Sequence, residues 1–121
     1  MNETCPQVNS LSAVLDVLKL QQNCRWTVLQ GVELVVLCGT HGRELMLNLY
    51  PPFQAPGIFQ RLLRRRAQHP DYYDGCYLCL NSENSENILS CWYQLREEGA
   101  DDKHQIAQLF QLAGIETEVW I

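Results

Sequence analysis

The sequence predicts an α+β domain in which an antiparallel sheet packs against helices. Apolar residues recur at helical spacing in three segments, and five short apolar runs are separated by turn-forming residues. These elements follow one another in the order α-β-β-β-α-β-β-α, and the connections within each strand set are too short for the crossover that parallel strands need. With 121 residues, the chain is expected to form one domain over residues 1–121.

The first predicted helix spans residues 10–22. Leu11, Val14, Leu15 and Leu18 fall at the i, i+3, i+4 and i+7 positions of one helix face, and Ser10 is suited to cap the N-terminus. Further apolar residues widen this face beyond a narrow stripe. A helix of this kind either lies deep in a core or offers a second side to a partner.

Three strands are predicted to follow as an antiparallel meander. They are residues 26–29, 32–38 and 44–50. Gly31 marks the first turn and residues 39–42 the second, since short β-rich runs separated by glycine-containing turns are typical of hairpins. Leu45, Leu47 and Leu49 share one side of the third strand, so that side is expected to face the core.

A second helix is predicted over residues 56–68, because Pro56 suits the first turn and a proline at position 70 stops the helix. Its apolar side is formed by Ile58, Phe59, Leu62 and Leu63. The rest of its circumference carries Arg61, Arg64, Arg65 and Arg66.

The last third of the sequence predicts two strands and a helix. The strands cover residues 76–80 and 88–95, and the polar segment 81–87 is expected to be the loop between them. The helix is expected to begin near Asp101, a good N-cap residue, and to end at Gly114. Residues 116–121 would then be a tail that frays or pairs as an edge strand.

Composition and charge narrow the class of protein. The formal net charge is −5 and the sequence pI is about 5.0, which argues against bulk electrostatic binding of nucleic acid. The first residues lack the basic and apolar regions of a secretory signal, and no run approaches the roughly 18 apolar residues of a membrane span. We expect a reduced, cytoplasmic protein whose six cysteines act as small buried apolar residues.

The candidate chemical motifs are weak. A redox Cys-x-x-Cys motif usually opens a helix and a zinc site needs a second pair, whereas Cys76 and Cys79 lie in a predicted strand that places them on opposite faces. His41, His69 and His104 have no neighbouring ligand residue in the sequence. We therefore expect no catalytic, cofactor-binding or metal-binding residues and no enzymatic activity. A cysteine nucleophile that meets a histidine only in space is an alternative.

One basic and aromatic group stands out, formed by the arginines of residues 61–66 together with Tyr72 and Tyr73. The first interpretation is the solvated face of a helix. The second is a contact to an acidic segment of a partner or of another subunit. Nucleic-acid binding comes last, because the chain as a whole is acidic.

Residues 74–112 carry a resemblance to a known family. Asp74-Gly75-Cys76-Tyr77-Leu78-Cys79-Leu80, a polar connection, Ile88-Leu89-Ser90-Cys91-Trp92-Tyr93-Gln94-Leu95, an acidic linker and an amphipathic helix are found there in this order. This stretch resembles the C-terminal half of effector-dedicated (class I) type III secretion chaperones. The first half, with its N-terminal helix, three strands and proline-marked helix, is similar in element order.

The resemblance implies a cytoplasmic homodimer without enzymatic activity that binds the N-terminal region of a secreted effector and keeps it competent for export. It assigns Ile58, Phe59, Leu62, Leu63 and Tyr77 to the dimer interface. It assigns Leu15, Leu18, Trp26, Val28, Val35, Leu47 and Leu49 to effector binding.

Two features depart from the family pattern. The last helix is short, and the arginines at positions 64–66 would repel their symmetry mates across the proposed interface. A heterodimer with a related chaperone is therefore an alternative. A regulatory or interaction subunit of a secretion system that binds a regulator is the competing functional hypothesis.

Overall fold

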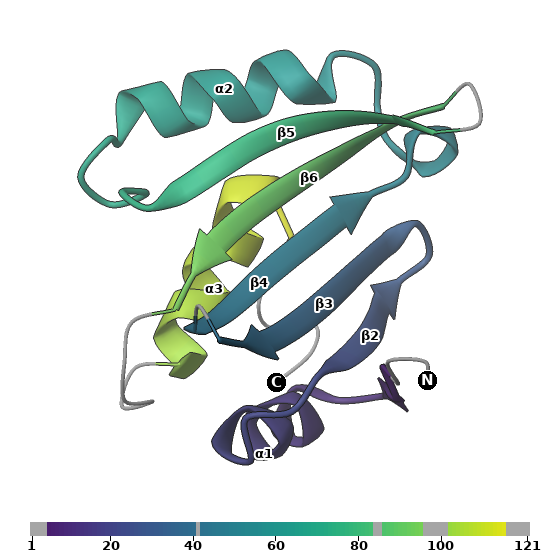
Figure 1. Cartoon of the computed structure of the whole chain (residues 1–121). Coiled ribbons are helices and arrows are strands. Elements are labelled where there is room, and N and C mark those ends of the chain that lie inside the picture. The colour runs from purple at the N-terminus through teal and green to yellow at the C-terminus, as the bar shows by residue number, and fades with distance from the viewer. Residues whose placement is uncertain (1–4, 41, 84–85, 96–101, 116–121) are drawn as a thin grey trace.

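A computed structural model describes residues 5–40, 42–83, 86–95 and 102–115 of the chain and confirms the α+β class. Its elements, with the labels of Figure 1, are β1 (Gln7–Val8), α1 (Leu11–Lys19), β2 (Cys24–Leu29), β3 (Val32–Gly39), β4 (Gly42–Leu49), η1 (Pro51–Phe53), α2 (Ile58–Gln68), β5 (Cys76–Glu83), β6 (Glu86–Gln94) and α3 (Asp102–Ala113). The predicted order of helices and strands is confirmed. Two short elements, β1 and η1, were not predicted.

The strands form one six-stranded sheet with the order β1-β2-β3-β4-β6-β5. The β2-β3-β4 meander is antiparallel as predicted, and β6 pairs antiparallel with both β4 and β5. The two sets of strands are therefore joined through β4 and β6, which leaves β5 at one edge. The exception is β1, which runs parallel to β2 at the other edge through only two residue pairs.

The hydrophobic core lies between one face of the sheet and helices α1 and α3, and Leu62 of α2 also belongs to it. Leu45, Leu47 and Leu49 point into it, as their alternation predicts. Phe110 of α3 is fully buried and stacks on Trp26 of β2, with ring centroids 6.1 Å apart. Each large apolar side chain buried in this way contributes about 1.5–3 kcal/mol.

The opposite face of the sheet is covered by no helix of the described part of the chain; in Figure 1 the strands lie in front of α3. The strand register aligns Val35, Met46, Trp92 and Tyr77 in one row across β3, β4, β6 and β5. Tyr77, at the edge strand, is 63% exposed. This open face therefore carries an apolar row that is only partly shielded by its neighbours.

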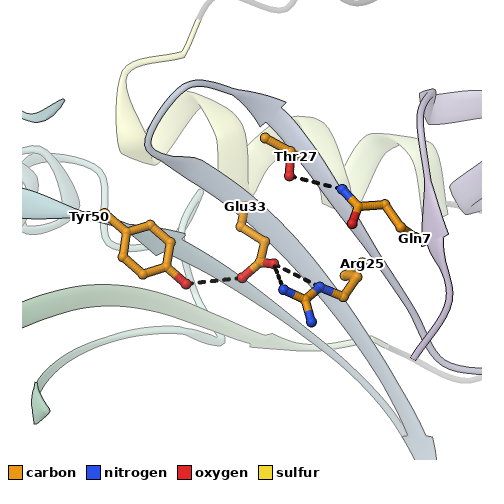
Figure 2. A network of polar contacts seen from close by, with 5 residues as sticks. All are labelled: Gln7, Arg25, Thr27, Glu33 and Tyr50. Atoms are coloured by element: carbon orange, nitrogen blue, oxygen red, sulfur yellow. Dashed lines mark hydrogen bonds and ion pairs between the residues drawn. The ribbon is translucent and has the colours of Figure 1, made fainter. Parts of the chain in front are cut away.

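A polar network lies beside that row, on the strands near β1 (Figure 2). Arg25 and Glu33 form an ion pair of 2.8 Å, and the Tyr50 hydroxyl donates a hydrogen bond of 3.1 Å to the same carboxylate. Burial, followed by the nearby Glu33 charge, raises the pKa of Tyr50. Because Arg25 is half exposed, the ion pair contributes at most about 1 kcal/mol.

Two parts of the chain differ from the prediction. The segment 81–87 was predicted to be a loop, but β5 continues to Glu83 and β6 begins at Glu86, with pairs such as Asn81 to Ile88. This prediction was wrong because a projecting hairpin can pair its backbone without burying apolar side chains. Helix α1 is shorter than predicted: it ends at Lys19, and Gln21 has a positive φ of 56°. The predicted tail at residues 116–121 lies outside the described residues.

A charged contact ties α3 to the sheet. Arg43 at the start of β4 donates to the carboxylate of Asp102, the first residue of α3, over 2.8 Å. Both side chains are largely buried. A carboxylate in the first turn also complements the helix dipole.

Across the described ranges, the helices are all too short or too polar to cross a membrane.

Candidate functional site

The two cysteines of the Cys-x-x-Cys motif lie on opposite faces of β5, which confirms the predicted alternation. Cys76 is buried, whereas Cys79 is exposed. Their thiols cannot bind one metal ion between them. In the residues that the structure describes, histidine, cysteine, aspartate and glutamate side chains form no group of three or more that could hold a metal.

Burial also raises the pKa of several thiols and so lowers their reactivity. It raises the pKa of Cys24 and of Cys76 to about 11, and that of Cys91 to about 12. The same cause raises the pKa of Cys38. A thiol must ionise to act as a nucleophile, and a pKa of 11 leaves under roughly 0.1% thiolate at pH 7.5.

Iodoacetamide at pH 7.5 is therefore expected to modify Cys79 of the folded protein well before Cys24, Cys76 or Cys91. Peptide mass spectrometry along a time course measures the order. Unfolding in guanidinium should remove the difference, because the protection comes from burial. Fast alkylation of a buried cysteine in the folded protein would contradict this order and support a cysteine nucleophile.

A partly exposed apolar surface surrounds the first half of α2, and we call it the α2 surface. It consists of Leu29, Phe53, Ile58, Phe59, Leu63 and Leu80. Four of these six are among the exposed large apolar residues: Leu29, Phe53, Leu63 and Leu80. They come from the end of β2, from η1, from α2 and from β5. Exposed apolar patches on otherwise polar surfaces are typical of sites that bind other proteins.

The α2 surface has a hollow on each side of the helix. The larger has a volume of about 500 Å³ and extends from the β2–β3 turn and η1 to the end of α3. Leu29, Phe53, Ile58, Arg61 and Arg65 are among the residues that line it.

The smaller hollow has a volume of about 260 Å³ and lies between α2 and the β5–β6 pair. Ile58, Phe59, Leu80 and Leu89 contribute its apolar walls. Together the two hollows give the α2 surface the concave shape that side chains of a bound polypeptide can fill.

The local sequence explains how the larger hollow forms. Gly31 has a φ of +83°, and Phe53 packs so closely on it that any side chain at position 31 would overlap the ring. The Tyr50 amide donates to the Gly31 carbonyl over 3.0 Å, which fixes η1 against the β2–β3 turn. Gly57, also at positive φ, then redirects the chain into α2. Gly31 thus fixes the Phe53 wall of the larger hollow, whereas Gly57 lies at the smaller one.

The residues assigned to a dimer interface fall into three groups. Ile58 and Phe59 are half-buried and Leu63 is exposed, so these three lie together on the α2 surface. Leu62 is fully buried within the core of the chain itself. Tyr77 points to the open face of the sheet, away from Leu80 and α2. The structure therefore brings together three of the five.

The residues assigned to effector binding are not gathered on one surface. Four of them line the core and expose 5% or less of their surface: Leu18, Trp26, Leu47 and Leu49. The side chains with accessible surface are Leu15 on α1, Val28 on β2 and Val35 on the open face. Sequence reasoning missed Leu29, Phe53 and Leu80; an apolar residue beside a turn, as at positions 29 and 53, is the signal that could have found two of them.

The residues of the basic and aromatic group are also distributed over different parts of the structure. Tyr73 is buried, and the Tyr72 hydroxyl donates to the Gln111 side chain over 2.5 Å, so Tyr72 packs on α3. Arg66 donates to the Cys76 carbonyl over 2.7 Å at the sheet edge. Arg61 and Arg65 line the larger hollow instead. The aromatic and basic side chains therefore form no single patch.

Comparison with known proteins gives one match. No curated protein and no solved structure is found to be similar to this chain. A family model described as HrpV-like matches residues 1–118, nearly the whole sequence, and HrpV is associated with type III secretion. The chain therefore belongs to the HrpV-like family and is a type III secretion-related protein.

Proposed function

We propose that this protein is a non-catalytic binding protein that holds the N-terminal region of a type III secreted effector on its α2 surface, in the cytoplasm, and keeps it competent for export. The observation that carries the proposal is the exposed apolar surface around α2 with a hollow on each side of the helix. Membership of a type III secretion-related family supports the choice of client. The element order shared with effector-dedicated chaperones supports it further.

The sheet offers a second means of holding an extended chain. Strand β5 is an edge strand of eight residues, and its Leu80 side chain belongs to the α2 surface. A bound segment can add backbone hydrogen bonds to such an edge while its side chains enter pockets beside it. Affinity would then come from the backbone and specificity from the hollows. One end of the edge is already occupied, because Arg66 binds the Cys76 carbonyl.

A regulatory subunit that binds a regulator, or a related chaperone as a heterodimer, is the second candidate. It is favoured by the charge of α2, which carries four arginines and no acidic residue. Two such helices facing each other in a homodimer would repel unless acidic groups lay between them. A partner with its own acidic surface avoids this repulsion.

Co-purification with the first hundred or so residues of effectors of the same secretion system, and separately with its regulators, tests the proposal. Leu63→Glu is expected to weaken binding of an effector segment by at least tenfold, because it places a charge in the apolar contact. Leu20→Glu is the matched control, since Leu20 is equally apolar, 66% exposed and located at the C-cap of α1.

Titration calorimetry measures the affinity of each purified variant for the effector segment. Equal loss of binding in the two variants would show that the effector segment does not bind specifically at the α2 surface. Retention of a folded regulator, with no effector segment bound, would favour the regulatory alternative.

A further inference from the structure

The larger hollow of the α2 surface combines apolar walls with two arginines. Ile58, Arg61 and Arg65 lie on one side of α2, three or four residues apart, and all three line this hollow. The opposite walls come from Leu29 and Phe53. A site of mixed apolar and positive character is thus built from segments that are distant in sequence.

The two guanidinium groups are positioned by backbone carbonyl groups. Arg65 donates to the Leu112 carbonyl over 2.6 Å and to the Gln111 carbonyl over 3.4 Å, at the C-terminal end of α3. Arg61 donates to the Pro56 carbonyl over 3.2 Å. These contacts orient the side chains, but a carbonyl group does not neutralise a full positive charge.

No carboxylate of the described ranges forms an ion pair with either arginine. The two ion pairs found there are Arg25 with Glu33 and Arg43 with Asp102, and both lie away from the hollow. A partner that covers the hollow removes water from Arg61 and Arg65. Desolvation of a positive charge is costly unless an acidic group replaces the lost water.

We infer that this hollow selects a polypeptide segment of the partner in which acidic residues alternate with apolar ones. The inference rests on the proposed function and specifies the chemistry of the bound segment. The apolar side chains would enter between Leu29, Phe53 and Ile58, and a carboxylate would meet the guanidinium groups. A basic segment is repelled, and a purely apolar one leaves the charges desolvated without compensation. The volume of about 500 Å³ lies within the roughly 300–1,000 Å³ common for protein binding pockets.

Fluorescence anisotropy with two labelled heptapeptides tests the inference on the full chain. The first probe is Gly-Leu-Glu-Val-Glu-Phe-Gly, and the second replaces both glutamates by glutamine. We expect the acidic probe to bind at least about threefold more tightly, which corresponds to a charge-assisted contact at a partly exposed site. The preference should fall as salt is raised from 50 to 500 mM, because ions screen the contact.

Two variants locate the effect. Arg61→Gln is expected to reduce the preference for the acidic probe, because only Arg65 then remains in the hollow. Arg64→Gln removes the same charge from the same helix at an exposed position outside the hollow, and it should leave the preference in place. Equal loss in both variants would indicate diffuse attraction to α2 and overturn the assignment to the hollow.

The remaining outcomes are equally decisive. Equal binding of both probes would overturn the acidic preference while leaving polypeptide binding intact. Binding of neither probe would overturn the hollow as a site for this class of segment, whereas the proposed function is judged separately by effector co-purification. Binding only to a chain shortened after Ile115 would show that residues 116–121 compete for the hollow, and this would overturn a partner as its occupant.

Discussion

Replacing Leu62 with glutamate is expected to unfold the protein, whereas the same change at Leu63 is expected to leave it folded. Leu62 is 0% exposed and Leu63 is 44% exposed, although the two are adjacent on α2. A carboxylate at position 62 would lie among the apolar side chains of the core, away from water. Burying a charge in this way costs several kcal/mol, comparable to the total stability of about 5–15 kcal/mol of a typical domain.

Urea denaturation followed by circular dichroism measures both variants. We expect Leu62→Glu to lose cooperative unfolding at 25 °C and Leu63→Glu to lie within about 1 kcal/mol of the original protein. Leu62→Ala provides a milder change, expected to cost about 2–5 kcal/mol through the cavity that it leaves. A folded and stable Leu62→Glu protein would show that α2 does not pack on the core as the structure describes.

Removing the carboxylate of Asp102 is expected to produce the second large effect. Asp102 accepts a hydrogen bond of 2.8 Å from Arg43, and the two side chains are only 7% and 12% exposed. Asp102→Ala would deprive a largely buried guanidinium of this carboxylate, and breaking such a pair from one side costs about 3–5 kcal/mol. The second carboxylate oxygen has no partner among the described residues, which makes the native pair itself less favourable.

A double-mutant cycle separates the interaction between Arg43 and Asp102 from the cost of leaving one of them without its partner. The single variants are Arg43→Met and Asp102→Leu, and the double variant carries both and replaces the pair by apolar side chains. We expect the double variant to be more stable than Asp102→Leu alone. The midpoint of urea denaturation measures each variant. Additive losses in the two single variants, with no recovery in the double variant, would mean that the ion pair does not couple α3 to β4.

The periodicity of apolar residues in the sequence was sufficient to predict most of the fold. The alternation of Leu45, Leu47 and Leu49 identified the buried side of β4, because a sheet covered on one face separates apolar from polar positions. It failed at β1, which has two residues and pairs with β2 through contacts distant in sequence. It also failed at residues 81–87, where backbone pairing extends a hairpin that carries no apolar pattern.

The residues of the candidate site were harder to predict from the sequence than the fold was. The apolar pattern placed Leu62 and Leu63 together, but only tertiary packing decides which of the two faces the core. Trp26 and Leu47 were assigned to a binding surface because a core residue and a contact residue have the same apolar character. The larger hollow draws its walls from the β2–β3 turn, η1, α2 and the end of α3, so no single segment reveals it.

Site-specific photo-crosslinking at the α2 surface tests the central claim most directly. The photoreactive residue p-benzoylphenylalanine replaces Leu63 in cells with an active secretion system, and a second strain carries it in place of Lys103, which is exposed at the end of α3 farther from α2. We predict an adduct from position 63 that mass spectrometry assigns to the N-terminal region of a secreted effector, with none from position 103. The absence of any adduct specific to position 63 would contradict the account.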